Sequence, residues 1–385
     1  MENESIFHKY EMIDLKKQDK IKLILSRSST REGLKQMNRQ QSPAKPINIS
    51  TEKNYFKTTP SIETEKDLRQ IISTYPKMLD KRIQNTLDHL SIEFIEASQI
   101  VILGSCSKQN RMIPLQVSHQ SLSIRDQQYF SFPKTNASSL IFNEVAPLYA
   151  SLYFMAHGFG HGLRINGTIE ETTTEAYLFK IEQVYFHCAR AAARSAIWTK
   201  ASAVDSRYLK KENFIEHAPF LLLKTRNQTG KTELSPRGDD AGFVKMLRPN
   251  TLLLPERPGN KIAVSLRNII QHPEVELLFM IPSSDQTLSI TGIAKIISDQ
   301  ELLEQCAVNG KKPKTGILIQ IESTELQTHQ VINKSQLWNQ ENKTKANITS
   351  FSKALSSHIN GTGLLGKATS VVVDVVVKHD MKNLY

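Results

Sequence analysis

Two short segments concentrate the residues that could bind a phosphate group. Leu234–Phe243 reads LSPRGDDAGF, and Leu254–Lys261, one hairpin further along, reads LPERPGNK. A phosphate monoester needs convergent cationic donors and close approach of the backbone. Arginine supplies a planar fork of N–H groups, lysine a point charge, and glycine the space. Taken alone, the two segments would be better explained as polar turns with surface charges.

Other common site chemistries find little support in the sequence. The three cysteines, Cys106, Cys188 and Cys306, are widely spaced, and neither a CxxC pair nor zinc-type histidine spacing accompanies them. The spacing suggests no Ser/His/Asp or Cys/His triad either. We therefore expect neither a structural metal nor a disulfide framework.

The chain of 385 residues carries a net charge of +11. Its lysines and arginines are interleaved with acidic residues along the whole length, which disfavours a nucleic-acid partner. Small phosphorylated ligands, or simply a basic soluble surface, explain the balance. No apolar run approaches the roughly 18 residues of a membrane-spanning helix, and the N-terminus lacks the apolar core of a secretory signal. We expect a cytoplasmic protein without a membrane partner.

Four pairs of matching segments indicate that a domain has been duplicated. They occur in the same order in both copies, at offsets of 120, 125, 125 and 140 residues. Any one match alone would be weak, but the set is typical of two domains of about 110 to 130 residues. The pairs are Phe94–Ser105 with Phe214–Thr225, Asn143–Met155 with Asn268–Met280, Leu163–Gly167 with Leu288–Gly292, and Ile181–Trp198 with Ile321–Trp338.

The second copy shows its elements most clearly. A helix over Ala263–Ile270 should end before Pro273, and Ser298 with Glu301 has capping-box spacing ahead of a short helix through Val308. Five or six strands with one packed helix predict a mainly β domain, a small closed barrel. The predicted strands are 220–224, 231–236, 251–254, 275–281, 287–297 and 315–321.

The segments outside the repeats are less regular. The first 78 residues are rich in Gln, Asn, Ser, Thr and Lys, which predicts a mostly irregular extension with one or two helices. Apolar residues from Leu79 to Ile95 recur every three or four positions, which predicts a helix. The expected divisions are an extension at 1–78, barrel domains at 79–203 and 204–340, and a C-terminal arm at 341–385 containing the strand-like Val371–Val377.

Four segments together resemble an FMN-binding branch of the pyridoxamine 5'-phosphate oxidase-like family. They read SPRGDDAGFV, LLLPERPGN, RNIIQHP and YFHCARAAARSAIW, and they spread the resemblance over residues 80–340. The resemblance implies split β-barrels that pair as homodimers and bind FMN in the interface with residues from both subunits. In a chain with two copies it implies two tandem split β-barrels packed as a pseudo-dimer, with further dimerisation left open.

The two copies retain different halves of this implied site. The second keeps SPRGD and PERPGN, whereas Met112–Pro133 in the first has neither. The first keeps an arginine where the second has Ser289, and its HCAR segment aligns with QTHQ at Gln327–Gln330. Our hypothesis is that only the site built from the two intact halves binds FMN. Its implied cofactor-binding residues are Ser235, Arg237, Gly238, Arg257, Asn260 and Lys261 from the second domain and Arg164, His187, Arg190, Arg194 and Trp198 from the first.

The resemblance also implies individual roles. Arg237, Arg257 and Lys261 would hold the FMN phosphate, while Asn260 and Ser235 would bond the ribityl chain or the ring edge.

Other roles remain open at this point. Trp198 would wall the site from the other domain, but the site that the strand of Arg164 faces is undecided. His187 and Cys188 are equally well explained as a strand-end hydrogen-bonding residue and a small core residue.

The leading functional interpretation is an FMN-dependent oxidase or reductase acting on an unidentified small molecule, with NAD(P)H or oxygen as redox partner. Pyridoxamine phosphate is not the expected substrate, because no Arg-x-His arrangement follows the final tryptophan. The alternative is a non-catalytic flavin- or haem-binding protein on the same scaffold. A third, weaker interpretation is an accessory protein whose N-terminal extension docks a partner.

Overall fold

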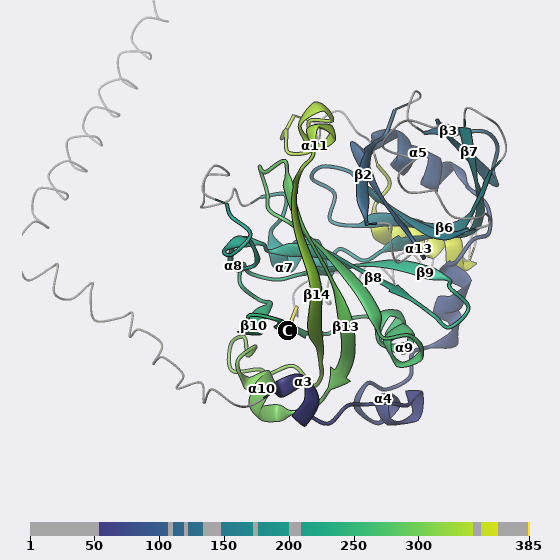
Figure 1. The fold of residues 1–385 in the computed structure, drawn as a ribbon. Coiled ribbons are helices and arrows are strands. Elements are labelled where there is room, and N and C mark those ends of the chain that lie inside the picture. Colours follow the sequence, from purple (N-terminus) through teal and green to yellow (C-terminus); the bar gives the residue numbers. More distant parts are fainter. Residues whose placement is uncertain are drawn as a thin grey trace, which may run out of the picture. The chain divides into compact units, whose positions relative to one another are not determined.

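The computed structural model of the chain describes residues 54–106, 111–118, 122–133, 148–171, 176–199, 209–341, 348–360 and 384–385. All of them belong to one compact unit, Asn54–Tyr385. Most of its strands lie in two seven-stranded antiparallel sheets, each curved into a split barrel (Figure 1).

The first sheet has the strand order β2-β1-β5-β6-β7-β4-β3. Helix α5 (His89–Ala97) precedes it and α7 (Arg190–Ser195) follows it. All six residues of β1 are buried, because one face of this strand meets the barrel core and the other meets the second sheet. The strands are β1 (Ile100–Ser105), β2 (Ile113–Gln116), β3 (Ser123–Ile124), β4 (Tyr129–Pro133), β5 (Leu148–Met155), β6 (Gly162–Glu171) and β7 (Ala176–His187).

The second sheet has the order β9-β8-β12-β13-β14-β11-β10, which is the same topology strand for strand. Its helices are α8 (Phe214–His217), α9 (Val264–Gln271), α10 (Gln300–Glu304) and α11 (Gln330–Lys334). Its strands are β8 (Phe220–Arg226), β9 (Thr232–Gly238), β10 (Lys245–Arg248), β11 (Thr251–Pro255), β12 (Glu274–Met280), β13 (Gln286–Ile297) and β14 (Gly316–Thr328).

The strand registers show that the copies are equivalent residue by residue. Gly167 lies opposite Ile181 just after a bulge, and Gly292 lies opposite Ile321 just after the matching bulge. A Cβ at these glycines would come within 1.9 Å and 2.2 Å of a carbonyl oxygen on the neighbouring strand, so both positions require glycine. The offsets of 125 and 140 residues seen in the sequence are thereby confirmed.

The two barrels meet through a pseudo-symmetric apolar core. Equivalent residues from both copies enter it, such as Met155 with Met280. Trp198 and Trp338, also equivalent, pack against each other in a tilted arrangement with ring centroids 5.6 Å apart. Each large apolar side chain buried here contributes roughly 1.5–3 kcal/mol. The interface therefore belongs to the folded core of the chain, and the tryptophan pair marks its pseudo-two-fold axis.

Most predicted elements of the second copy are present, but two predicted helices have other bounds and one strand was not predicted. The helix expected from Leu79 begins at His89, because Gln84 is extended in a β-bridge with Val184 and Asp88 forms the capping box. Before that bridge lies only a short 3₁₀ helix, Lys77–Arg82.

The other two differences lie in the second copy. The N-cap of α10 is Asp299 rather than Ser298, since its carboxylate accepts from two backbone N–H groups, and α10 ends at Glu304 rather than near Val308. Strand β10, whose buried residues are few, was not predicted at all.

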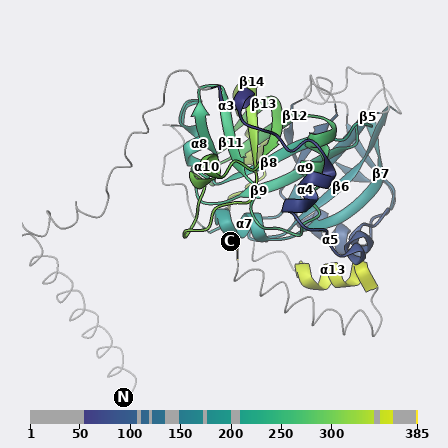
Figure 2. The ribbon, with the colours of Figure 1, turned by 90° about the horizontal axis from the view of Figure 1, so that it is seen from below.

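The outer segments dock onto the barrels. In the described part of the extension, α3 (Tyr55–Thr58) and α4 (Glu65–Ile71) lie against the second barrel, where Ile62 bridges to Ile296. Helix α13 (Phe351–Asn360) lies beside α5 (Figure 2), where His358 bonds the N-cap residue of α5 at 3.0 Å. Val371–Val377, predicted as a strand, lies outside the described residues.

No helix in the described part of the chain combines the length and the apolar character needed to cross a membrane.

Candidate functional site

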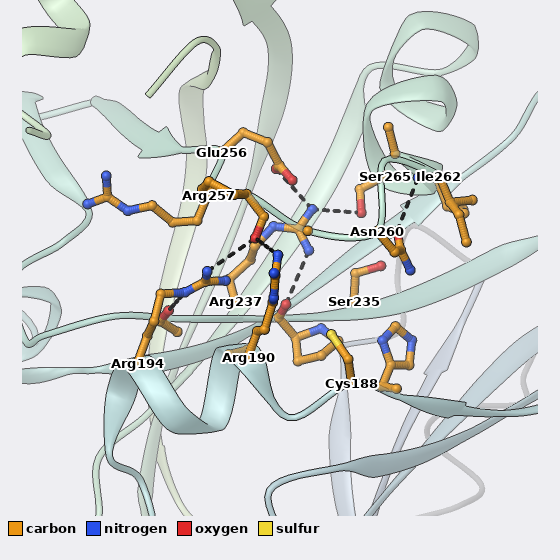
Figure 3. Close-up of a pocket in the computed structure, with 18 of the residues that line it drawn as sticks. Cys188, Arg190, Arg194, Ser235, Arg237, Glu256, Arg257, Asn260, Ile262 and Ser265 are labelled. Atoms are coloured by element: carbon orange, nitrogen blue, oxygen red, sulfur yellow. Dashed lines mark hydrogen bonds and ion pairs between the residues drawn. The ribbon is translucent and has the colours of Figure 1, made fainter. Parts of the chain in front are cut away.

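A cavity lies where the two barrels meet, and both copies line it (Figure 3). The second barrel contributes β9, the loop after β11 and the start of α9. The first contributes the end of β7 and α7. Nine of the eleven predicted site residues line this cavity: Ser235, Arg237, Gly238, Arg257, Asn260, Arg164, His187, Arg190 and Arg194.

Arg237 is held within the second barrel's half of the cavity. It lies on β9, and its Nη2 donates to Glu256 Oε2 at 3.2 Å and to Ser265 Oγ at 3.0 Å. Its Nε is buried and has no hydrogen-bond partner. An unsatisfied buried donor costs about 1–3 kcal/mol, which an acceptor entering the cavity would recover.

Arg190 and Arg194 extend from α7 of the first barrel toward the loop of the second (Figure 3). Their Nη1 atoms donate to the same carbonyl, Pro258 O, at 3.1 Å and 3.2 Å. Arg194 Nε also donates to Gly238 O at 3.2 Å. The two side chains thus place first-barrel cations beside the phosphate-binding segments of the second barrel.

Arg164 closes the inner end of the cavity, which answers the question of which site its strand faces. Its guanidinium is 1% exposed and forms an ion pair with Glu233 of β9. It also donates to Leu234 O at 2.7 Å and to Ser235 Oγ at 3.1 Å. Arg164 therefore joins the barrels and positions the Ser235 hydroxyl.

The cavity has an excess of positive charge. Among its described lining residues there are six arginines and one carboxylate, that of Glu256. Burial, followed by the positive charges of Arg164, Arg82 and Arg237, holds the pKa of His187 well below its ordinary value. The imidazole is therefore neutral at pH 7, and the same positive field favours an anionic ligand.

The contacts of Gly238 and Arg257 are structural: neither residue is seen in a position that binds a phosphate directly. A Cβ at Gly238 would lie 2.2 Å from the carbonyl oxygen of Ala191, so the glycine allows α7 to pack on β9. Arg257 Nε binds Asp239 Oδ2 at 2.5 Å and its Nη1 donates to Cys306 O at 2.8 Å. Figure 3 shows its guanidinium pointing away from those of Arg190 and Arg194. Arg257 thus anchors the loop, and its binding of phosphate stays a prediction.

Two predicted residues lie elsewhere. Lys261 has a backbone φ of 63°, and its carbonyl accepts from Arg69 Nη1 at 2.8 Å, so its side chain lines a neighbouring cavity. Trp198 does not wall the site. Its indole Nε1 donates to Phe159 O at 2.7 Å and its ring packs against Trp338 at the pseudo-symmetry axis.

Several other lining residues were not predicted from the sequence. Arg82 precedes the repeats, is 7% exposed, and lies with its Cζ 4.8 Å from the centroid of the Tyr185 ring. Ser265 and Glu256 orient Arg237, a relationship that only the packing of α9 against β9 reveals.

The position in the first copy that is equivalent to Arg237 has no cationic side chain. Leu115 pairs with Val101 of β1 as Arg237 pairs with Leu221 of β8, so leucine occupies the place of the arginine. Ile113 likewise occupies the place of Ser235. Apolar side chains cannot bind phosphate, which leaves the described part of this second half-site without its main donors.

Residues 210–333 match the family model described as "Pyridoxamine 5'-phosphate oxidase". No curated protein matches the chain.

Three solved structures illustrate the similarity. A putative pyridoxamine 5'-phosphate oxidase from Lactobacillus delbrueckii is 17% identical, covering 32% of this chain and 98% of its own, with a TM-score of 0.25. The heme storage protein HutZ from Vibrio cholerae is 16% identical, covering 30% and 90%, with a TM-score of 0.23. An FMN-binding protein from Syntrophomonas wolfei is 11% identical, covering 30% and 83%, with a TM-score of 0.24.

The matched segment includes β9, the loop after β11 and α9, which supply the second barrel's half of the cavity. Residues 210–333 therefore belong to the pyridoxamine 5'-phosphate oxidase-like family of split barrels.

Proposed function

We propose that the chain binds one FMN in the cavity between its barrels and acts as an FMN-dependent oxidoreductase on a small molecule. The observation that carries the proposal is the convergence of Arg237 from one barrel with Arg190 and Arg194 from the other around a single cavity. FMN, when bound, would supply hydride or electron transfer.

The donor set suits the phosphate of such a cofactor. Arg237 Nε is buried without a partner, and Ser265, at the first turn of α9, lies 3.0 Å from the same guanidinium. A phosphate binds most favourably where planar N–H forks and hydroxyl donors converge. Arg237 and Ser265 would hold the phosphate, with Arg190 and Arg194 adding charge from the first barrel.

The remaining residues would bind and orient the rest of the molecule. Arg164 holds the Ser235 hydroxyl in place at 3.1 Å, which leaves that hydroxyl able to bond a polar edge of the ligand. The neutral His187 adds no positive charge of its own. Because α7 and the loop after β11 are joined through Pro258, the site requires both barrels in their observed packing.

A second candidate, a non-catalytic haem-binding protein, is favoured by one observation. His187 is neutral at pH 7 and its Nε2 is buried without a partner, which is the state in which an imidazole can bind iron. The excess of arginines around it favours flavin phosphate more strongly, so we rank haem second.

The absorbance spectrum of the purified chain, followed by anaerobic addition of NADPH and then air, tests the proposal. Flavin absorbance that bleaches with reductant and returns in air supports the oxidoreductase. A haem spectrum, or bound flavin that neither NADH nor NADPH reduces, would contradict it.

A further inference from the structure

A second cavity borders the same loop, Pro255–Lys261, but has different outer walls. These come from the end of α4, from Lys311–Thr315 and from Tyr385. Its volume of about 350 Å³ lies within the range of small-molecule sites. Neither Arg237 nor Arg190 lines it, although residues 256–260 and Ala263 line both cavities.

The walls of this second cavity are strongly cationic. Its positive side chains are those of Lys261, Lys311, Lys312, Lys314 and Arg257. Among the described lining residues the one acidic side chain is that of Glu256, which already pairs with Arg237 at 3.2 Å. Lys314 has no hydrogen-bond or ion-pair partner among the residues that the structure describes. Lys312 lies 3.6 Å from Glu304, and Lys311 donates to Tyr385 O at 3.3 Å. Lys314 is therefore the cation of this cavity most available to an anion.

A buried hydroxyl adds an independent sign of a ligand. Thr315 is 1% exposed, and its Oγ1 has no hydrogen-bond partner. Buried hydroxyl groups normally find a partner, because leaving one unsatisfied costs about 1–3 kcal/mol. Thr315 lines the cavity, where a ligand oxygen would satisfy it.

The other walls are apolar and partly aromatic. Ile71, Ile72 and Pro313 line the cavity together with the ring of Tyr385. The Tyr385 hydroxyl donates to the buried Asp239 carboxylate at 2.5 Å, and its ring lies 5.6 Å from Arg257 Cζ. The tyrosine is thus fixed in place as a flat surface beside the cations.

We propose that this second cavity binds a phosphorylated aromatic molecule of mononucleotide size. Its phosphate would lie among Lys312, Lys314 and Thr315, and its ring against Tyr385 and the isoleucines. Charge alone would suit any anion, but the aromatic and aliphatic walls favour one that carries a flat ring. The site stands independently of whether the first cavity holds flavin.

The test is binding of AMP to the full chain saturated with FMN, measured by calorimetry, with adenosine and inorganic phosphate as the two halves of the ligand. We expect AMP to bind more tightly than either half. K312E/K314E should lower the affinity for AMP by at least about tenfold, because hydrogen bonds from charged donors are lost. Thr315→Val should lower it by about threefold to tenfold, because a neutral hydrogen bond is lost.

One control makes the result decisive. K180E/K211E makes the same change of net charge at exposed lysines that line neither cavity, and it should change AMP affinity by less than about twofold. Absence of AMP binding at millimolar concentration, displacement of FMN by AMP, or equal losses in K180E/K211E would overturn the proposal.

Discussion

Arg164 of β6 and Glu233 of β9 form an ion pair that links the two barrels directly behind the candidate flavin site. The arginine side chain is 1% exposed and the glutamate 14%. Glu233 also accepts from the Tyr185 hydroxyl at 2.9 Å and from Asn166 Nδ2 at 3.1 Å. Burial lowers the pKa of Arg164 to about 10, so the guanidinium stays charged at neutral pH. The ion pair therefore favours the observed packing of the two barrels.

Removing one member of this pair should destabilise the whole chain. We expect Arg164→Met to lower the free energy of unfolding by about 3–5 kcal/mol in urea titrations, because Glu233 is left buried and uncompensated. R164M/E233Q should recover part of that loss. The exposed pair Lys231–Glu182 also joins the two barrels, and Glu182→Ala should cost less than about 1 kcal/mol. Equal losses in the two single variants would refute a buried, coupled pair.

Trp198 should matter to stability and little to the cofactor. Trp198→Phe removes the hydrogen bond to Phe159 O, so we expect a loss of about 1 kcal/mol in the free energy of unfolding. Flavin affinity should change by less than about twofold, since the ring lies at the pseudo-symmetry axis rather than in the cavity. Flavin fluorescence titration measures the second quantity, and a tenfold loss of affinity would restore the wall role expected from the sequence.

The stability of the chain should fall between pH 6.5 and pH 4 partly through His161. Burial among Phe94, Phe186 and Phe351 lowers its pKa to about 4. The unfolded chain therefore binds a proton in this window that the folded chain does not, and stability is complete only above the unfolded pKa. The effect is on the order of 3 kcal/mol.

His161→Phe isolates this contribution. His187 and His329 also have lowered pKa values and will add to the slope, so the informative quantity is the difference between variant and wild type. We expect the variant to lose less stability than the wild type between pH 6.5 and pH 4.5. Parallel curves would show that His161 does not titrate in this range.

The first barrel's share of the site can be tested with a matched pair of variants. R190A/R194A should weaken FMN by about tenfold or more, because two cations leave the cavity. Gln330 and Lys334 occupy the equivalent positions on α11, and Q330A/K334A should leave flavin affinity unchanged. The opposite pattern would place the flavin in the other half-site.

The sequence predicted the fold better than the site. The offsets between repeats were confirmed because paired strands preserve register, as the glycines after the two bulges show. The helix start at His89 was missed because a tertiary bridge at Gln84 overrides the apolar periodicity before it. Lys261 was predicted at the flavin site, but its positive φ directs the side chain elsewhere, and no local sequence pattern predicts that φ.

Other site features depend on contacts between distant segments. Arg82 lines the cavity although it lies outside the repeated segments. Arg257 binds Asp239 and Cys306 O and does not point to the cavity centre. Motif spacing gives neither the partner nor the direction of a long side chain. The sequence could predict which segments meet, but not which of their cations remain available to a ligand.

Flavin stoichiometry in paired variants tests the central claim most directly. We expect one FMN per chain in the purified protein reconstituted with excess cofactor. Arg237→Ala should weaken binding by roughly 10–100-fold, while Leu115→Ala at the equivalent position should retain one tightly bound FMN. Two flavins per chain, or unchanged binding in Arg237→Ala, would contradict a single site shared by the two barrels.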